Sequence, residues 1–339
     1  MAGPFQGVKR NIGSSATLPL GQPTSHADCV TLAGIGDGQS CARVPCQPGL
    51  WTGCGLPNFP HGPLVVGGTG KTGRRVAEGM RRRGRKIRIG SRSATPAFDW
   101  KDRSTWNAAL EGVAAAYIIY APGLAVPGAP ETIRAFVTQA AEQGIARLVL
   151  LSGRGEEEAQ ACERIVQEVD LAWSIVRASW FNQNFSESEF LRMVLEGAIT
   201  LPAADVPEPF VDAQDIADVA IATLTEKGHD HEIYEFTGTR LLTFTDAARQ
   251  ISEAAGRNIR FVRIPQEAFA QAVARSGVSG ELVWLLSYLF EAVLDGRNAY
   301  LGDGVQRALG REPTDFADHA RRVAALGTWD VARYDAGAM

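Results

Sequence analysis

A glycine-rich turn between an apolar run and a helical pattern is the feature that most constrains this sequence. Residues 64–73 read LVVGGTGKTG, with glycines at 67, 68, 70 and 73, and the helical pattern continues as RRVAEGMRRRG. In a strand–turn–helix unit, glycines permit the tight turn, a close approach of backbone to a pyrophosphate, and close packing of helix on strand. The N–H groups at the helix start then attract phosphates. The turn therefore predicts a dinucleotide site in an α/β fold.

The same residues include Gly-Lys-Thr at 70–72, which also occurs in ATP-binding P-loops. A P-loop needs a further glycine five residues before the Gly-Lys pair, and Val65 stands at that position. A P-loop is also longer, because it wraps around a phosphate. The sequence excludes a P-loop here.

Beyond residue 62, short apolar runs alternate with helical patterns. The expected strands are 64–67, 86–90, 115–120, 147–152, 171–177 and 233–236, and the first helices are 72–83, 130–143 and 157–168. This alternation is typical of a parallel sheet with helices on both faces. Apolar runs without polar alternation, such as RLVLLS, suit strands that are buried on both sides. The predicted class is a Rossmann-type, doubly wound α/β fold.

After Trp180 the pattern changes. Helices are expected at 186–195, at 213–224 with Asp215 near its start, and at 242–256 with Thr243 or Thr245 as cap. A strand is expected at 259–265, and the chain from residue 266 onward is mostly helical in pattern. We expect a dinucleotide-binding domain over 62–200, completed by a strand near 232–237. A smaller, mainly α-rich substrate lobe is expected over 201–330.

Residues 1–61 are rich in Gly, Pro, Ser and Thr and contain Cys29, Cys41, Cys46 and Cys54. A zinc or disulfide module, with His26 and His61 as further ligands, is one interpretation. The spacing contains no C-x-x-C pair, which structural zinc sites commonly have. A disordered leader is favoured instead, because this composition offers little apolar surface to bury. No metal site is expected.

Composition points to an ordinary globular protein. The 339 residues are 45% hydrophobic and 21% charged, with a net charge of -4. This charge gives no reason to expect nucleic acid or an anionic membrane as a partner. No apolar run approaches the roughly 20 residues that span a bilayer, and the N-terminus lacks a signal-peptide core. We therefore expect a cytoplasmic enzyme with a small-molecule substrate, and the sequence leaves its oligomeric state open, a homodimer included.

The residues after the second expected strand indicate which nicotinamide cofactor the site would take. NAD sites usually place an acidic residue about 20 residues beyond the glycines, where it binds the ribose 2′-OH. Here the chain reads KIRIGSRSA, without an acid, and offers Ser91, Arg92 and Ser93. An arginine flanked by hydroxyls suits a 2′-phosphate. NADP(H) is therefore favoured over NAD(H).

Several segments together resemble the NmrA-like, atypical short-chain dehydrogenase/reductase family, and in particular bacterial relatives of the ergot-alkaloid reductases (the festuclavine and agroclavine dehydrogenases). The segments are GGTGKTGRRV, RIGSRS, FDWKDRSTWNAAL, RLVLLSG, LAWSIVRASWFNQNF, PFVDAQDIADVA and YEFTGTRLLTF, and they cover about residues 63 to 325.

The resemblance implies a set of site residues. Gly67, Gly70, Lys71, Thr72 and Gly73 match the phosphate loop, and Arg92 matches the arginine after the second strand. Asp99 and Trp100 match the segment after the family's third strand, beside the adenine. Ala121 and Pro122 match the turn after the fourth strand, and Ser152 ends the fifth, near the nicotinamide. Phe181, Asn182 and Asn184 match the substrate side. For two of Trp180, Phe181 and Phe185, core packing is the favoured interpretation.

One departure from the wider family affects the chemistry. Typical short-chain dehydrogenases use a Tyr-x-x-x-Lys pair to move the proton that accompanies hydride transfer, but no tyrosine here is followed by lysine at that spacing, and Glu163 and Gln167 stand in the corresponding region. The favoured function is reduction, by NADPH, of an iminium, quinone or activated double bond, with Tyr120, Ser152 or Glu163 as candidate proton donors. The alternative is a non-catalytic, NADP(H)-sensing regulator.

Overall fold

A six-stranded parallel sheet organises the part of the chain that the structure describes. The structure is a computed structural model that describes residues 61–332. The strand order is β2-β1-β3-β4-β5-β7, and every neighbouring pair is parallel. The strands are β1 (Leu64–Val66), β2 (Arg88–Gly90), β3 (Ala115–Ile118), β4 (Arg147–Gly153), β5 (Ala172–Ala178) and β7 (Glu232–Phe236). The predicted doubly wound α/β class is confirmed.

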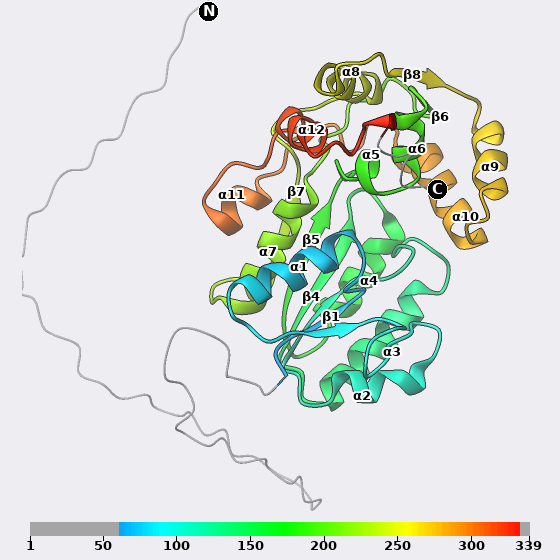
Figure 1. Cartoon of the computed structure of the whole chain (residues 1–339). Coiled ribbons are helices and arrows are strands. Elements are labelled where there is room, and N and C mark those ends of the chain that lie inside the picture. The colour runs from blue at the N-terminus through cyan, green and yellow to red at the C-terminus, as the bar shows by residue number, and fades with distance from the viewer. Residues whose placement is uncertain (1–60, 333–339) are drawn as a thin grey trace, which may run out of the picture. The chain divides into compact units, whose positions relative to one another are not determined.

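Helices cover both faces of this sheet, which explains why its strands lack polar alternation (Figure 1). Helices α1 (Lys71–Arg82) and α7 (Ala213–Thr225) pack together on one face, and α3 (Ala129–Glu142) and α4 (Glu157–Gln167) on the other. Successive side chains of a strand point to opposite faces. Accordingly, Val65 of β1 belongs to the cluster with α1 and α7, while Val66 belongs to the cluster with α3 and α4.

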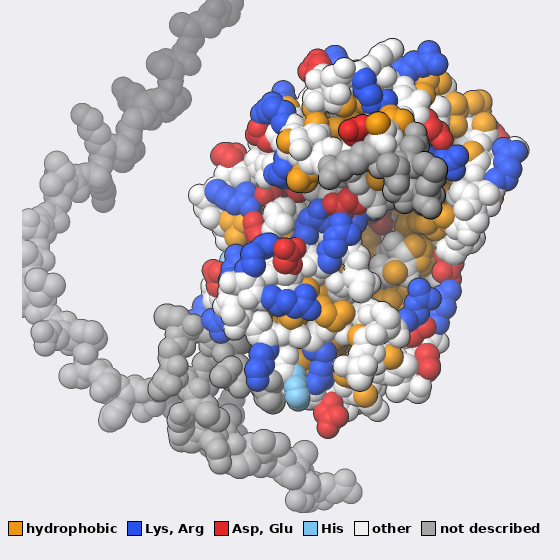
Figure 2. Space-filling view, in the orientation of Figure 1, with side chains coloured by type: hydrophobic (Ala, Val, Ile, Leu, Met, Phe, Trp, Pro, Cys, Tyr) orange, Lys and Arg blue, Asp and Glu red, His pale blue; other side chains and the backbone are white. Residues whose placement is uncertain are grey.

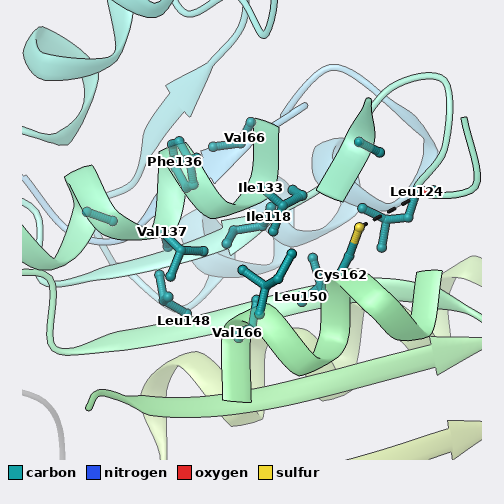
Figure 3. Packing of buried hydrophobic residues seen from close by; sticks show 14 of the residues in the cluster. Val66, Ile118, Leu124, Ile133, Phe136, Val137, Leu148, Leu150, Cys162 and Val166 are labelled. Atoms are coloured by element: carbon teal, nitrogen blue, oxygen red, sulfur yellow. Dashed lines mark hydrogen bonds between the residues drawn. The ribbon is translucent and has the colours of Figure 1, made fainter. Parts of the chain in front are cut away.

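Figure 3 shows the second of these clusters from close by. Ile118 and Leu150 of the strands meet Phe136 of α3 and Val166 of α4, and all four side chains are fully buried. The thiol of Cys162 lies in the same layer, with its Sγ 4.0 Å from the carbonyl oxygen of Leu124. Burial raises the pKa of this thiol to about 12, so that Cys162 is a packing residue and not a nucleophile.

A second, two-stranded parallel sheet was not expected. It pairs β6 (Ala198–Leu201) with β8 (Arg260–Arg263). Helix α11 (Gly304–Leu309) packs on α7 and β7 of the main sheet, whereas helices α8 (Phe244–Ala255), α9 (Gln266–Arg275), α10 (Gly280–Tyr288) and α12 (Phe316–Ala325) lie around the small one. Their shared core is rich in phenylalanine, including Phe185, Phe210, Phe244 and Phe316, whose rings contact one another. The later part of the chain is thus mainly helical, as predicted, but contains this small sheet. The domain boundary near residue 200 stays a prediction.

The prediction of a single helix over residues 186–195 is wrong. The structure has two helices there, α5 (Asn184–Glu187) and α6 (Glu189–Leu195), separated by Ser188. Ser188 has an extended backbone (φ −151°, ψ −162°), and its hydroxyl donates to the carbonyl oxygen of Asn184 at 2.9 Å. A serine hydroxyl competes in this way with helical hydrogen bonds.

The strand that the family resemblance implied before Asp99 is also absent from the described residues between β2 and β3. Asp99 takes part only in an isolated bridge with Asp102. The segment before it closes into a loop, in which the N–H of Phe98 donates to the carbonyl oxygen of Ser91 at 2.9 Å. Pro96 within this loop has no N–H to give to a strand partner. The short helices η1 (Arg103–Thr105) and α2 (Trp106–Leu110) follow.

A buried polar cluster joins α7 to α12. Asp212 caps α7 by accepting from the N–H of Gln214 at 2.8 Å, and its side chain also contacts His319 Nδ1 at 3.2 Å and Arg322 Nη2 at 2.5 Å. Burial by itself would raise the pKa of Asp212, but the hydrogen bonds from His319 and Gln214 and the charge of Arg322 hold it below its ordinary value. The expected acid at the helix start, Asp215, is present beside this cap.

Within residues 61–332, no helix combines the length and the apolar character that crossing a bilayer requires. The expectations for Cys29, Cys41, Cys46, Cys54 and His26 lie outside the described residues, and His61 is exposed at their edge.

Candidate active site

The glycine turn has the geometry that the sequence predicted. Gly67 has a positive φ of 72°, which favours glycine, and its carbonyl oxygen accepts from the N–H of Gly70 at 2.9 Å. A Cβ at Gly73 would lie 2.3 Å from that same carbonyl oxygen and 2.8 Å from the Cα of Gly68. Only glycine fits at position 73. Helix α1 begins directly after the turn and has no acidic residue in its first turn.

A cavity of about 430 Å³ opens at the carboxyl ends of the strands. Its wall includes Lys71 and Thr72, at the start of α1, and Ile119 and Tyr120, which follow β3. Strands β1 and β3 are neighbours, but β2 pairs on the other side of β1. The cavity therefore lies at the point where the strand order reverses, which is where open α/β sheets bind their ligands.

The wall opposite the sheet is apolar. Helix α10 and the π-helical turn η2 (Leu289–Val293) that continues it supply a row of aliphatic side chains, and the segment after β5 supplies aromatic ones. These side chains are Leu282, Leu285, Leu286, Leu289, Val293, Trp180, Phe181 and Phe190. In the view of Figure 2, hydrophobic side chains gather in the hollow beside α10, while Lys and Arg side chains lie over α1. The helical segment over 284–293 thus lines the cavity.

Arg92 and its two serine neighbours lie at the same edge of the sheet as the glycine turn. The N–H of Gly67 donates to the carbonyl oxygen of Gly90 at 2.9 Å, which joins the turn to the end of β2 just before Ser91. The Arg92 side chain is exposed, and among residues 61–332 it has no ion-pair partner. Arg92 does not line the cavity.

Asp99 and Trp100 are held in local contacts. The Asp99 carboxylate accepts from the N–H of Lys101 at 3.0 Å, and the Trp100 indole N–H donates to the carbonyl oxygen of Ile119 at 3.1 Å. The Trp100 ring also packs on Tyr120, with ring centroids 5.0 Å apart. Trp100 thereby fixes the start of the segment that carries Tyr120 into the cavity wall.

Ser152 and Glu163, two of the candidate proton donors, belong to one buried network. The Ser152 hydroxyl donates to Glu163 Oε1 at 2.6 Å, and Arg177 Nε donates to the same oxygen at 2.9 Å. Arg177 Nη1 also donates to Glu235 Oε1 at 2.7 Å, and these hydrogen bonds raise the pKa of Arg177. Ser152 lines the cavity, but Glu163 lies behind it and does not. Glu163 is thus a partner of Ser152 and Arg177, and it has no direct access to a ligand.

The turn after β3 contributes Tyr120 and Pro122 to the cavity wall, whereas Ala121 is exposed. Of the expected substrate residues, Phe181 and Asn184 line the cavity. Asn182 is fully buried away from it, and among the described residues neither atom of its amide has a hydrogen-bond partner. Core packing describes Phe185, which is 1% exposed, while Trp180 packs on Phe290 and also faces the cavity.

Sequence reasoning missed Arg154 and Glu156, two charged residues of the cavity wall. The Arg154 guanidinium is buried against the Tyr300 ring, 4.3 Å from its centroid, and lies 3.7 Å from Glu235 Oε2. Burial, with repulsion from Glu158 and Glu163, raises the pKa of the Glu156 carboxyl to about 7. In the sequence, Glu156 opens the acidic run 156–158, which is common at helix starts because of the helix dipole. Nothing in that pattern separates it from its neighbours.

A second buried acid lies behind the wall. Glu208 is 0% exposed, and its Oε2 accepts from the hydroxyl of Ser179, a cavity residue, at 3.1 Å. Burial raises the pKa of Glu208 to about 7. Glu208 itself does not line the cavity.

This sheet order, with a glycine turn and a cavity at its reversal point, defines the class of Rossmann-type α/β proteins. A solved structure of that class, triphenylmethane reductase from Citrobacter sp. in complex with NADP(H), superposes with a TM-score of 0.62. It shares 18% sequence identity and covers 77% of this chain and 99% of its own.

Sequence comparison narrows the class to a family. The NmrA-like family matches residues 158–314. Agroclavine dehydrogenase from Claviceps fusiformis is 30% identical over 276 residues, which cover 75% of this chain and 94% of that protein. YesF of Bacillus subtilis (strain 168), an uncharacterized oxidoreductase, is 30% identical over 277 residues, which cover 78% and 96%. This chain belongs to the NmrA-like family.

Proposed function

We propose that this protein is an NADPH-dependent reductase that delivers hydride to a small organic acceptor, namely an iminium, a quinone or an activated double bond. One observation carries the proposal. A single cavity extends from the start of α1, where Lys71 and Thr72 line it, to the apolar wall formed by α10 and Trp180. Such a cavity offers one end to phosphates and the other to a flat, apolar molecule.

The glycine turn fits a dinucleotide. The close approach at Gly73 lets the helix start directly above β1, and the exposed Gly70 leaves no side chain between α1 and a pyrophosphate. In the proposed complex Gly67, Gly70, Lys71, Thr72 and Gly73 hold the pyrophosphate. Arg92 with Ser91 and Ser93 holds the 2′-phosphate, since a guanidinium forms charge-assisted hydrogen bonds with it. When bound, the nicotinamide supplies hydride.

The chain's own residues then position the acceptor. Tyr120, Phe181 and Asn184 face the cavity, and the leucines of α10 exclude water from its far side. A dry, apolar wall favours a planar acceptor and strengthens the electrostatic interactions within the site. No Tyr-x-x-x-Lys pair occurs in the sequence, which favours acceptors that need little or no help from such a pair. The names of the relatives, agroclavine dehydrogenase among them, agree with a reductase of this kind.

The proposal is tested by mixing the purified protein with NADPH and each acceptor of a panel, and following the absorbance of the reduced nicotinamide. Menadione, cyclohexenone and an N-methyl dihydroisoquinolinium salt represent the quinones, the activated double bonds and the iminium ions. Consumption of NADPH with at least one class supports the reductase. Tight NADPH binding without turnover of any acceptor would instead favour the NADP(H)-sensing regulator.

A further inference from the structure

The Glu156 carboxyl is an acidic group of the cavity wall that has no hydrogen-bond or ion-pair partner among the described residues. Glu156 occupies the N-cap position of α4, where an acidic side chain commonly accepts from the helix N–H groups, but it makes no such bond. Among residues 61–332 it forms no side-chain hydrogen bond or ion pair, and it lines the cavity. A carboxyl in this position is available to a ligand.

Gly153, at the end of β4, makes the space that Glu156 occupies. A Cβ at this glycine would lie 1.8 Å from Glu156 Oε1 and 2.4 Å from its Cδ. The carboxyl therefore packs directly on the Gly153 backbone, and Gly153 lines the cavity too. The absence of a side chain at position 153 holds the carboxyl at the carboxyl end of the central strands, where Ser152 also lies.

The surroundings of Glu156 favour its neutral form. Glu158 and Glu163 of α4 are both acidic, with Glu158 Oε2 accepting from the Tyr288 hydroxyl of α10 at 2.8 Å. Two cations line the same cavity, Arg154 and Lys71. Arg154 is engaged with Tyr300 and Glu235, and Lys71, at the start of α1, forms no ion pair with Glu156 in the described part of the chain. The Cys162 thiol, also on α4, is neutral because burial raises its pKa to about 12. No described cation neutralises Glu156, so that protonation is the remaining way to remove its charge.

We propose that Glu156 is the catalytic acid of this cavity and donates its proton to the reduced acceptor. This inference rests on the proposed reductase function. With an enone or quinone, the acceptor gains hydride from the reduced nicotinamide, and the electron pair of its double bond moves to the carbonyl oxygen. That oxygen takes the proton from Glu156, whose carboxylate then regains a proton from water. The acceptor is reduced by two electrons and the nicotinamide is oxidised by two.

Other acids and hydroxyls of the site are less suited to this role. Glu163 lies behind Ser152, is paired with Arg177 and does not line the cavity. Glu208 is separated from the cavity by Ser179. Tyr120 lines the cavity, but its ring is packed on that of Trp100, with centroids 5.0 Å apart. Of the carboxyls in this comparison, Glu156 is the one that lines the cavity directly.

The first test follows the carboxyl itself and needs no turnover. Protein labelled with ¹³C at the glutamate side-chain carboxyls is titrated by NMR, and the resonance absent from the E156Q spectrum is that of Glu156. We expect it to titrate near pH 7. Titration at the ordinary value of a glutamate would overturn the proposal, whatever the protein does with NADPH.

The second test compares acceptors. An enone or quinone needs a proton, whereas an iminium ion becomes a neutral amine on gaining hydride alone. We expect E156Q to slow cyclohexenone and menadione reduction by about 100-fold and to remove the fall in kcat/KM above pH 7. It should leave iminium reduction and the NADPH dissociation constant unchanged. The control is E157Q, an exposed neighbour on the same helix, which should behave as wild type.

The third variant, G153A, keeps the acid but displaces it. Because the new Cβ would meet the flexible end of Glu156, we expect the fold to persist. The kcat for cyclohexenone should fall, while iminium reduction continues.

Two outcomes separate the role of Glu156 from the reductase function. Equal rates for wild type and E156Q on every acceptor would overturn the role of Glu156 but not the reductase function. If wild-type protein oxidises NADPH in the presence of none of the acceptors, the reductase function is overturned and, with it, the proton transfer.

Discussion

At the residue scale, the glycine turn requires a position, residue 73, at which there is no room for a Cβ atom. Gly73 lies against the backbone of Gly67 and Gly68, so the contact cannot be relieved by moving a flexible group. Gly153 is different, because its neighbour is the end of the Glu156 side chain. The first glycine therefore constrains the fold of the turn, and the second the position of a functional group.

G73A should accordingly damage both stability and cofactor binding. A methyl group placed 2.3 Å from the Gly67 carbonyl oxygen forces α1 away from β1, and overpacking of this kind costs about 1–3 kcal/mol. We expect a lower free energy of unfolding in urea and a clear rise in the NADPH dissociation constant. G280A is the control, since a Cβ there meets nothing within 4 Å. Unchanged NADPH affinity in G73A would contradict the assignment of the turn.

Residue-scale prediction worked where the signal is local. The glycines of 67–73 and the cap Thr243 are recognised from their immediate neighbours, and the structure has both the turn and a full capping box between Thr243 and Asp246. Glu156 could not be found in this way. Its raised pKa depends on burial and on charges that the fold brings together, and none of these is visible in a run of three glutamates.

At the element scale, hydrogen bonds and an ion pair of Asp212 join the start of α7 to α12. Asp212 is fully buried and holds His319 and Arg322 of α12 while capping α7. Gln183, just before α5, donates to Asp212 Oδ1 at 2.6 Å. A single carboxylate thus joins three helices, two of them distant in sequence.

D212N should therefore destabilise the protein by about 1.5–3 kcal/mol, because it removes the charge of a buried carboxylate that accepts hydrogen bonds while keeping a side chain that caps well. The folded-state pKa of Asp212 is lowered, so its contribution is present above the unfolded value, about 4, and is lost as pH falls through the folded value. The gap between wild type and D212N in urea unfolding should be constant at neutral pH and shrink in acid.

The control for D212N is D303N, because the Asp303 side chain is 71% exposed and surface substitutions change stability by no more than about 0.5 kcal/mol. A D212N variant as stable as D303N would show that the cluster of Asp212, His319 and Arg322 does not stabilise the fold.

Elements with strong local patterns were predicted well, and those set by distant contacts were not. The strands of the main sheet are apolar runs between turns, so they can be predicted from the local sequence pattern. Strand β6 is a four-residue segment whose partner, β8, comes much later in the chain. The break at Ser188 also escaped notice, since serine is tolerated within helices and the surrounding pattern is helical.

At the scale of the whole molecule, the cavity depends on both parts of the chain. The sheet supplies the glycine turn and the residues after β3 and β4, and α10 with η2 closes the apolar side. Sequence patterns predicted these elements but not that α10 faces the cavity, because an apolar helix is equally suited to a core or an interface.

The glycine turn, Arg92 and the residues of the cavity wall all lie within 61–332. We therefore expect a chain that begins at residue 61 to fold and to bind NADPH with the dissociation constant of the full-length protein. The described residues form hydrophobic clusters on both faces of the main sheet and around the small one. Calorimetric titration of both proteins measures the effect, with thermal unfolding as the check on folding. Loss of binding or of cooperative unfolding in the shorter chain would assign residues 1–60 a structural role.

In the proposed complex the glycine turn and Arg92 together hold NADPH. Calorimetric dissociation constants for NADPH and NADH, measured on wild type and on R92A, test this arrangement. We expect wild type to prefer NADPH, and R92A to lose this preference because its affinity for NADPH falls while its affinity for NADH is nearly unchanged. A charge-assisted hydrogen bond to a phosphate contributes about 1.5–3 kcal/mol, so the loss should be at least tenfold. Failure of wild type to bind either dinucleotide would contradict this arrangement, and equal weakening of both by R92A would refute the 2′-phosphate site.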